Sequence, residues 1–376
     1  MNSVFQEIEK IREGHSFQLS AALSNRHTII CQESPREKTA YCFSVPIRNN
    51  KNNGIVDLRF YHNKQSSVFN GSNSQFIITD RVKMINQYGQ CEVLLQGELK
   101  KKTNESIIFT NNEGIVEILP TLNGLLFMFC CRALSEPPQI LLHFDRSFES
   151  TRTNNKFFSV MREKHIPFIT ASCIGSINDY GKVVAPVEIF YQRLNEFDYV
   201  LTFNTSNKSK NCIAIEINMQ ESKLFQDTTV ESKHPTINNA FGGIAFLGKS
   251  EAFGEQMLYS RLEISNIALL QNKKILKSIL HIPQLGYGTS PIAVNRTPKR
   301  FCSFGSNWEN KIDITDIVAL STESNGYYHL DLTKLFGNLN KNSQNFVIRG
   351  NSTNKPVIIP TGDSFYAPQI FEVKYQ

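Results

Sequence analysis

The sequence predicts an all-β protein built from tandem antiparallel β-sandwiches of jelly-roll-like form, with a short helix at its N-terminus. The chain contains 27 Phe and 12 Tyr but one Trp, and aromatic residues are enriched in strands. Short alternating runs rich in Val, Ile and Thr follow one another, separated by turn residues. No segment has a helical pattern long enough for a βαβ crossover, so a doubly wound fold is not expected.

The first block, 1–131, is predicted to form the short helix and one sandwich. Phe5, Ile8 and Ile11 fall on one face of an amphipathic helix. The runs that follow are joined by connectors rich in Asn and Gly, which accept positive φ at little cost. The candidate strands are 39–46, 54–62, 74–80, 91–97, 105–111, 114–120 and 124–131.

A second block, 132–221, begins near Pro137 and Pro138, where consecutive prolines remove the hydrogen-bond donors that a ladder needs. This block either forms a separate domain or continues the first sandwich. Pro167 and Pro186 indicate that some of its strands lie at sheet edges. The candidate strands are 139–145, 156–161, 166–175, 182–192, 197–205 and 212–219.

The third block, 222–376, is predicted to be a further β-sandwich with one helical turn at 333–339. In its first loop, Pro235 fixes its own φ and pushes His234 out of the α region. Asn238 can bond to nearby backbone, so this stretch is expected to turn a strand over, although His234 is also a candidate ligand or base. The candidate strands are 228–233, 243–250, 257–269, 273–285, 299–305, 326–334, 345–350 and 371–376.

Several motifs of the third block follow one another in a definite order. They are DTTV at 227–230, HPTIN at 234–238 with Phe241-Gly242, FLG at 246–248, MLYSRLEIS at 257–265, KKILKSILHIPQL at 273–285, Trp308-Glu309, NGYYHLDLTKLF at 325–336, Asn345-Phe346 and SFYAPQIFEVKY at 364–375. In this order they resemble DNRLRE-type domains, which are bacterial β-sandwich modules related to carbohydrate-binding modules. The literal Asp-Asn-Arg-Leu-Arg-Glu string and a second central Trp are missing. The resemblance implies recognition of a glycan or cell-wall polysaccharide, outside the cell or at its surface.

Trp308, Glu309, Tyr327 and Tyr328 are the candidate ligand-binding residues. Exposed aromatic rings can stack on sugar rings, while neighbouring polar groups bond to hydroxyls. Alternatively, Trp308 packs in the core of a sandwich. One of the two tyrosines must face inward, because neighbours on a strand point to opposite sides.

Local motifs for catalysis or metal binding are weak. Glu309, Asp313 and Asp316 could form an acid/base pair for glycoside hydrolysis, a weak Ca²⁺ site or a solvated edge. None of the eight His lies within four residues of another, which excludes local His-based metal motifs. Neither a phosphate-binding loop nor a dinucleotide fingerprint occurs, so no cofactor is expected. The eight Cys are expected to be reduced core residues, although their even number leaves disulfides open.

Charge and hydropathy exclude some partners. The net charge is +6, but the basic residues are scattered, so no nucleic-acid partner is expected. The longest apolar run, Leu125 to Cys131, is far too short to span a membrane. No secretory signal is visible, so a cytoplasmic location remains an alternative to the cell surface.

The sequence therefore predicts a non-catalytic protein that binds polysaccharide through its third block. The competing interpretation is a self-associating structural subunit of a surface appendage, spore layer or phage-like assembly. A third interpretation, a glycan-cleaving enzyme, would use Glu309 or Asp313.

Overall fold

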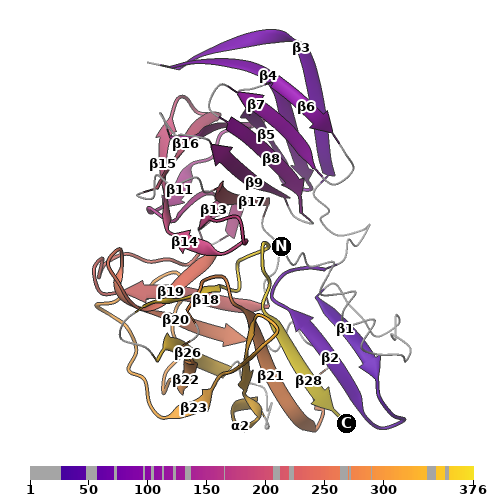
Figure 1. Ribbon diagram of the computed structural model, residues 1–376, viewed down its shortest axis with the longest axis vertical. Helices are drawn as coiled ribbons and strands as arrows, with labels where there is room; N and C mark the ends of the chain where they lie inside the picture. The colour runs from indigo at the N-terminus through magenta and orange to yellow at the C-terminus, as the bar shows by residue number, and fades with distance from the viewer. Residues whose placement is uncertain are drawn as a thin grey trace. The chain divides into compact units, whose positions relative to one another are not determined.

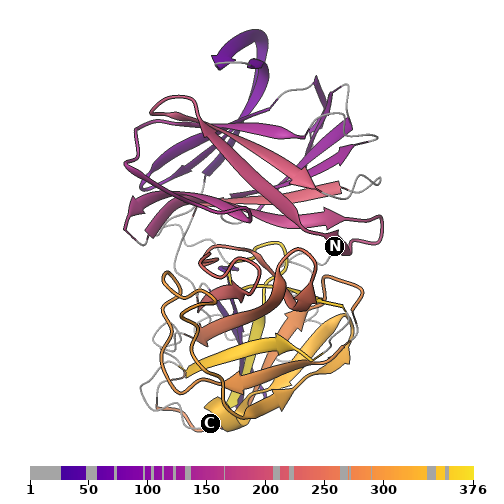
Figure 2. The same cartoon turned by 90° about the vertical axis from the view of Figure 1, so that its left-hand side faces the viewer.

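A computed structural model describes residues 27–47, 57–71, 74–95, 98–102, 106–111, 114–121, 124–131, 137–164, 166–205, 212–219, 224–262, 270, 272–288, 290–336, 344–351 and 355–376. The regular secondary structure of this part of the chain is almost entirely antiparallel β-sheet, as predicted (Figures 1 and 2). The helix expected at Phe5, Ile8 and Ile11 lies outside the described residues. Helix α2 (Thr333–Phe336) falls within the helical turn predicted at 333–339. No helix among the described residues is long and apolar enough to cross a membrane.

The chain divides into two compact units. Unit 1 comprises Met1–Asn49 and Ser222–Gln376, and unit 2 comprises Asn50–Glu221. Strands of the second block pair with strands of the first inside unit 2, which corresponds to the alternative that the second block continues the first. The grouping differs from the three sequence blocks because a strand at Lys38–Phe43, in the first block, pairs with the last strand of the chain. Pairing between distant segments leaves no trace in local alternation, which reports only which residues of one strand share a face.

Unit 2 contains two antiparallel sheets. In sheet 2A the order is β15 (Val187–Arg193), β16 (Asp198–Thr205), β10 (Gln139–Phe144), β5 (Gly89–Leu95), β4 (Ser74–Asn86) and β3 (Asp57–Gly71). In sheet 2B it is β11 (Ser150–Thr153), β12 (Phe157–Glu163), β13 (Ile166–Ile177), β17 (Cys212–Met219), β9 (Gly124–Cys131), β8 (Gly114–Pro120), β7 (Ile107–Asn111) and β6 (Glu98–Lys102), with β14 (Val183–Ala185) beside β13. Leu142 and Phe144 of sheet 2A share one buried cluster with Phe127, Phe158 and Ile215 of sheet 2B. The arrangement is therefore sandwich-like.

The two prolines of the second block behave differently. Pro186 separates β14 from β15, and β15 ends sheet 2A among the described strands, as predicted for an edge. Pro167 lies in β13, between β12 and β17, so its predicted edge position is wrong. It pairs with Met161 where the register with β12 shifts, and pairing with β17 begins only at Ile169. The missing donor therefore falls where the ladder is already irregular.

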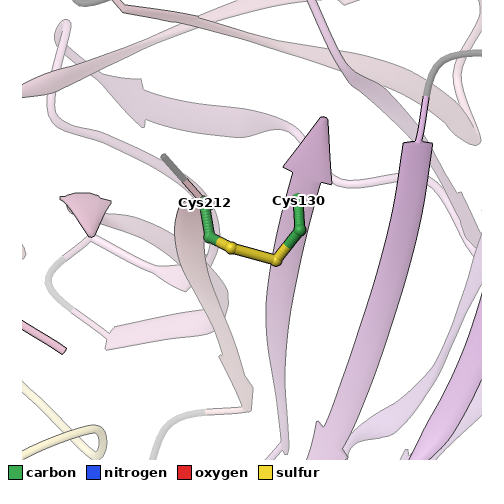
Figure 3. The surroundings of a disulfide bond; sticks show 2 residues. All are labelled: Cys130 and Cys212. Carbon is green, nitrogen blue, oxygen red and sulfur yellow. A yellow bond between two sulfur atoms is a disulfide. The ribbon is translucent and has the colours of Figure 1, made fainter. Parts of the chain in front are cut away.

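A disulfide joins the two central strands of sheet 2B. Cys130 of β9 lies directly opposite Cys212 of β17, with 4.2 Å between their Cα atoms (Figure 3). The expectation that all cysteines are reduced is therefore wrong for this pair, because the register of the strands, which the sequence does not reveal, places the two thiols face to face. It holds for four buried cysteines, Cys31, Cys42, Cys91 and Cys173, whereas free Cys302 is exposed. Burial raises the pKa of the Cys42 thiol to about 12, as expected for an inert core residue.

Unit 1 also contains two antiparallel sheets. In sheet 1A the order is β1 (Thr28–Gln32), β2 (Lys38–Phe43), β28 (Ile370–Tyr375), β21 (Ile275–Pro283), β25 (Tyr327–Asp331) and β24 (Thr322–Ser324). In sheet 1B it is β23 (Ile317–Leu320), β22 (Ile292–Arg296), β26 (Gln344–Gly350), β20 (Gly254–Leu262), β19 (Ile244–Ser250) and β27 (Val357–Pro360), with β18 (Phe225–Glu231) also paired to β20. Leu280, Tyr328 and Phe371 of sheet 1A share a buried cluster with Leu258 and Phe346 of sheet 1B.

The predicted strand at 299–305 is wrong. These residues belong to a long loop, 297–316, between β22 and β23. Phe301 is buried in this loop, so its apolar character reflects packing rather than a place in a ladder. The loop carries Trp308 and Glu309, two of the residues predicted to bind a ligand.

Candidate functional site

The loop 297–316 covers the outer face of sheet 1B. Met257 and Tyr259 alternate along β20 with the core residue Leu258, and they therefore point away from the core. Together with Phe301 they form a second apolar cluster, against which Trp308 packs partly buried. The Tyr259 hydroxyl donates to the carbonyl of Ile312, which ties the loop to the strand.

The loop is also bound to the turn that contains His234 and Pro235. The Asn238 amide donates to the carbonyls of Ser303 and Ser306, at 2.7 Å in each case. The backbone N–H of Glu309 donates to the carbonyl of Pro235 at 3.2 Å. The turn thus has the predicted backbone role, and it anchors a second loop as well. The backbone of Glu309 is thereby held against the turn that carries His234.

Trp308 sits at the tip of a tight turn. The backbone N–H of Asn307 donates to Oδ1 of Asn310 at 2.8 Å, and the backbone N–H of Asn310 donates to Oδ1 of Asn307 at 3.1 Å. These two bonds close the turn. The ammonium of Lys311 lies 4.2 Å from the centre of the Trp308 ring, a cation–π contact. Glu309 is exposed on the same turn. We call Trp308, Glu309, Lys311 and His234 the Trp surface.

A buried polar network supports the Trp surface from behind. The carboxylate of Glu231 is completely buried, and its Oε1 lies 2.8 Å from Nδ1 of His234. Its Oε2 accepts from the amide of Gln256 at 2.8 Å, and Gln256 Oε1 accepts from the backbone N–H of Phe246 at 2.5 Å. Because an ionised carboxylate can only accept, His234 presents Nδ1–H to Glu231 and leaves Nε2 as the acceptor. His234 is a third exposed, so this nitrogen suits a ligand hydroxyl.

The two tyrosines do not join the Trp surface. Both lie in β25 of sheet 1A, whereas Trp308 lies over sheet 1B. Tyr328 is fully buried and its hydroxyl donates to the carbonyl of Gly288 at 2.7 Å, so its ring has no face free for a sugar. Tyr327 points to the other side of the strand, as alternation requires, but it is 9% exposed. The predicted residues therefore divide into a surface pair and a pair packed into the sheet.

The acidic residues of the loop are all exposed. Glu309, Asp313 and Asp316 lie at the surface. Among the described residues, no group of three His, Cys, Asp or Glu side chains is placed to hold a metal ion. A solvated edge, one of the interpretations open from the sequence, accounts for these acids without any chemistry.

Sheet 1A brings together polar residues that no local sequence motif connects. His281 of β21 and His329 of β25 are directly paired across the two strands. Ser324 of β24 and Glu372 of β28 flank this pair and contact it through hydrogen bonds. Their separation along the chain hides this group from any search for local motifs. The alternation of apolar and polar residues in the segments around His281 and His329 was the one available signal, because it placed each histidine on the outer face of its strand.

No protein-family model matches the chain, and no curated protein resembles it at a significant level.

Proposed function

We propose that unit 1 binds a glycan or cell-wall polysaccharide through the Trp surface, without catalysis at that surface. The observation that carries this proposal is that the single Trp of the chain lies partly exposed on a turn fixed by hydrogen bonds. A rigid aromatic ring offers an apolar face to a sugar, and adjacent polar groups bond to its hydroxyls. Lys311 supplies a donor at the ring, and Glu309 and His234 add an acceptor carboxylate and an acceptor nitrogen on the neighbouring turns. The resemblance of 222–376 to DNRLRE-type modules supports the same assignment.

Because the chain has one Trp, tryptophan fluorescence reports on this surface alone. We expect a saturable change in the emission of the full chain on titration with one or more members of a panel of purified polysaccharides. Glu309→Gln should weaken binding about tenfold, since a charged hydrogen bond to a ligand is worth about 1.5 kcal/mol. Tyr180→Ala, at a residue 85% exposed in unit 2, is the matched control and should bind as the parent does. If no polysaccharide of the panel changes the tryptophan emission, the proposal is contradicted.

An extracellular or cell-surface location forms part of this proposal. The Cys130–Cys212 disulfide supports it, because protein disulfides form and persist mainly in oxidising compartments. Thiol alkylation without prior reduction, on protein taken directly from its natural source, should leave these two cysteines unmodified, and mass spectrometry checks this. If both are alkylated without prior reduction, the cytoplasmic alternative holds instead.

A structural subunit remains the second candidate, because β23 ends sheet 1B among the described strands and exposes apolar side chains. Ile317 is 50% exposed and Leu320 is 54% exposed. A strand in this position can pair with a second copy. If the protein assembles in this way, sedimentation velocity will show species that grow with concentration and that Leu320→Lys removes. Ile115→Lys, at a residue 44% exposed on β8 inside sheet 2B, is the control and should not affect assembly.

A further inference from the structure

Four side chains form an unbroken chain of hydrogen bonds across the outer face of sheet 1A. The hydroxyl of Ser324 lies 2.7 Å from Nε2 of His329. Nδ1 of His329 lies 2.6 Å from Nδ1 of His281. Nε2 of His281 lies 2.8 Å from Oε2 of Glu372. The four residues come from four adjacent strands, β24, β25, β21 and β28.

The protons in this chain can be assigned from its charged end. Because the carboxylate of Glu372 can only accept, His281 places its proton on Nε2. Nδ1 of neutral His281 is then an acceptor, and His329 donates to it from its own Nδ1. This leaves Nε2 of neutral His329 as the acceptor for the Ser324 hydroxyl, whereas the Ser324 carbonyl, 3.3 Å from the same nitrogen, can accept from it only when His329 is protonated. Every hydrogen bond therefore runs in the same direction, from the serine to the glutamate, which is how a general base is arranged beside a nucleophile.

The surroundings of His329 favour its neutral form. Burial, followed by the charge of His281, lowers its pKa below the usual value, while the Ser324 carbonyl and Glu372 act in the opposite direction. The ring also stacks against Tyr327, with 6.3 Å between the ring centres. A neutral imidazole at neutral pH is the state that a general base requires. Other titratable side chains lie on the same outer face of sheet 1A, on β2, β28, β21 and β25. They are Tyr41, Glu372, Lys374, Lys277, His281, Tyr327 and Asp331.

We propose that Ser324 is the nucleophile of an acyl-ester hydrolysis site in which His329 is the general base. Ser324 is exposed and directly precedes the two-residue hairpin turn of Asn325 and Gly326, which have φ of 52° and 80°. A nucleophile at such a tip can reach an ester that projects from a polymer or a small acyl ester. The site lies on sheet 1A and does not depend on the Trp surface of sheet 1B.

The reaction is a two-step acyl transfer to water. The Ser324 oxygen forms a bond to the ester carbonyl carbon while its proton passes to Nε2 of His329. The bond from that carbon to the alcohol oxygen then breaks, and the alcohol leaves with the proton from Nε2. Water then forms a bond to the acyl carbon while one of its protons passes to Nε2 of His329. The bond from that carbon to the Ser324 oxygen breaks, the acid leaves, and the Ser324 oxygen takes the proton from Nε2. His281 and Glu372 are positioning residues, because they hold His329 in the required tautomer and stabilise its protonated form.

The first test uses the full chain with p-nitrophenyl acetate as substrate and a fluorophosphonate as a covalent probe. We expect phosphonylation at Ser324, located by peptide mass spectrometry, and steady-state release of p-nitrophenol. Ser324→Ala and His329→Gln should each lower kcat/KM at least 100-fold. Ser147→Ala, at another exposed serine, is the control and should change neither signal. Absence of the adduct at Ser324, or turnover that survives His329→Gln, would overturn the assignment.

The second test asks whether Glu372 positions His329 for the reaction or only stabilises the fold. Glu372→Gln should keep the adduct at Ser324, lower kcat about tenfold with little change in KM, and move the acidic limb of the pH–rate profile to lower pH. The limb moves because the lost carboxylate no longer favours the protonated form of His329. Glu372→Asp should restore part of the rate. An unchanged pH profile in Glu372→Gln would show that Glu372 has only a structural role and would refute the hydrogen-bond chain as a functional unit.

Discussion

The two units share one architecture, but they differ in what surrounds their cores. In unit 2 the most prominent features are stabilising ones. Phe148 stacks on Phe168 with 4.9 Å between ring centres, Phe144 contacts both rings and Tyr199, and a disulfide joins the central strands of one sheet. In unit 1 the outer face of sheet 1A carries an ordered network of polar side chains, and the loop that bears Trp308 covers an apolar cluster on the outer face of sheet 1B. A sandwich core is therefore compatible with different surfaces, and function has to be sought outside the core.

The largest expected effect concerns the disulfide of unit 2. Replacing Cys130 and Cys212 together by Ala should destabilise unit 2 by about 4.5 kcal/mol, by the chain-entropy estimate for a separation of 82 residues. Urea unfolding followed by circular dichroism should show an earlier transition, while the fluorescence of Trp308, which reports unit 1, should not move. Cys302→Ala, at an exposed free cysteine, is the control. An equal shift of both signals would mean that the two units unfold together.

The buried carboxylate of unit 1 provides the next effect. Glu231→Leu should destabilise unit 1 by about 3 kcal/mol, because it leaves the Gln256 donor buried without its partner and releases His234. The fluorescence of Trp308 measures this change directly. Glu255→Gln, at an exposed acid on the same sheet, should cost less than about 0.5 kcal/mol. Similar losses in the two variants would mean that the network contributes nothing specific.

Tyr328 tests whether its hydroxyl is structural. Tyr328→Phe should cost about 1 kcal/mol, because it removes the donor to the Gly288 carbonyl while the buried ring keeps its packing. Polysaccharide binding should be unaffected. Tyr180→Phe, at a highly exposed tyrosine, should leave stability unchanged. If Tyr328→Phe loses polysaccharide binding but keeps its full stability, Tyr328 is a ligand-binding residue, as first predicted.

The smallest effect is the pH dependence of unit 1. The pKa of His329 is lower in the folded protein than in the unfolded chain, mainly through burial. The unfolded state therefore binds more protons between the two pKa values, and stability falls as the pH drops from 6.5 through the folded pKa. In His329→Gln the decline in stability between pH 7 and pH 5 should be shallower. An unchanged slope would mean that His329 is as easily protonated in the fold as in the unfolded chain.

Local features of the sequence were sufficient for several elements. Alternation predicted that one of Tyr327 and Tyr328 faces inward, and Tyr328 lies in the core of unit 1; the turn at His234 and Pro235 formed as the proline requires. The pattern was misleading at 299–305, where Phe301 is apolar because it packs on the outside of a sheet. An alternating run indicates that its apolar residues are buried. It does not indicate whether they lie in a strand that faces the core or in a loop that packs on the outer face of a sheet.

The sequence by itself determined the β class of the chain, most strand positions and the turn chemistry, because period-two alternation, proline and asparagine act within a few residues. Only the tertiary structure decided which strands are neighbours. That pairing joined β2 to β28, set Cys130 opposite Cys212, and lined up Ser324, His329, His281 and Glu372. The physical reason is that strand register is fixed by contacts between segments far apart in the chain, and such contacts have no period to be read from a single sequence.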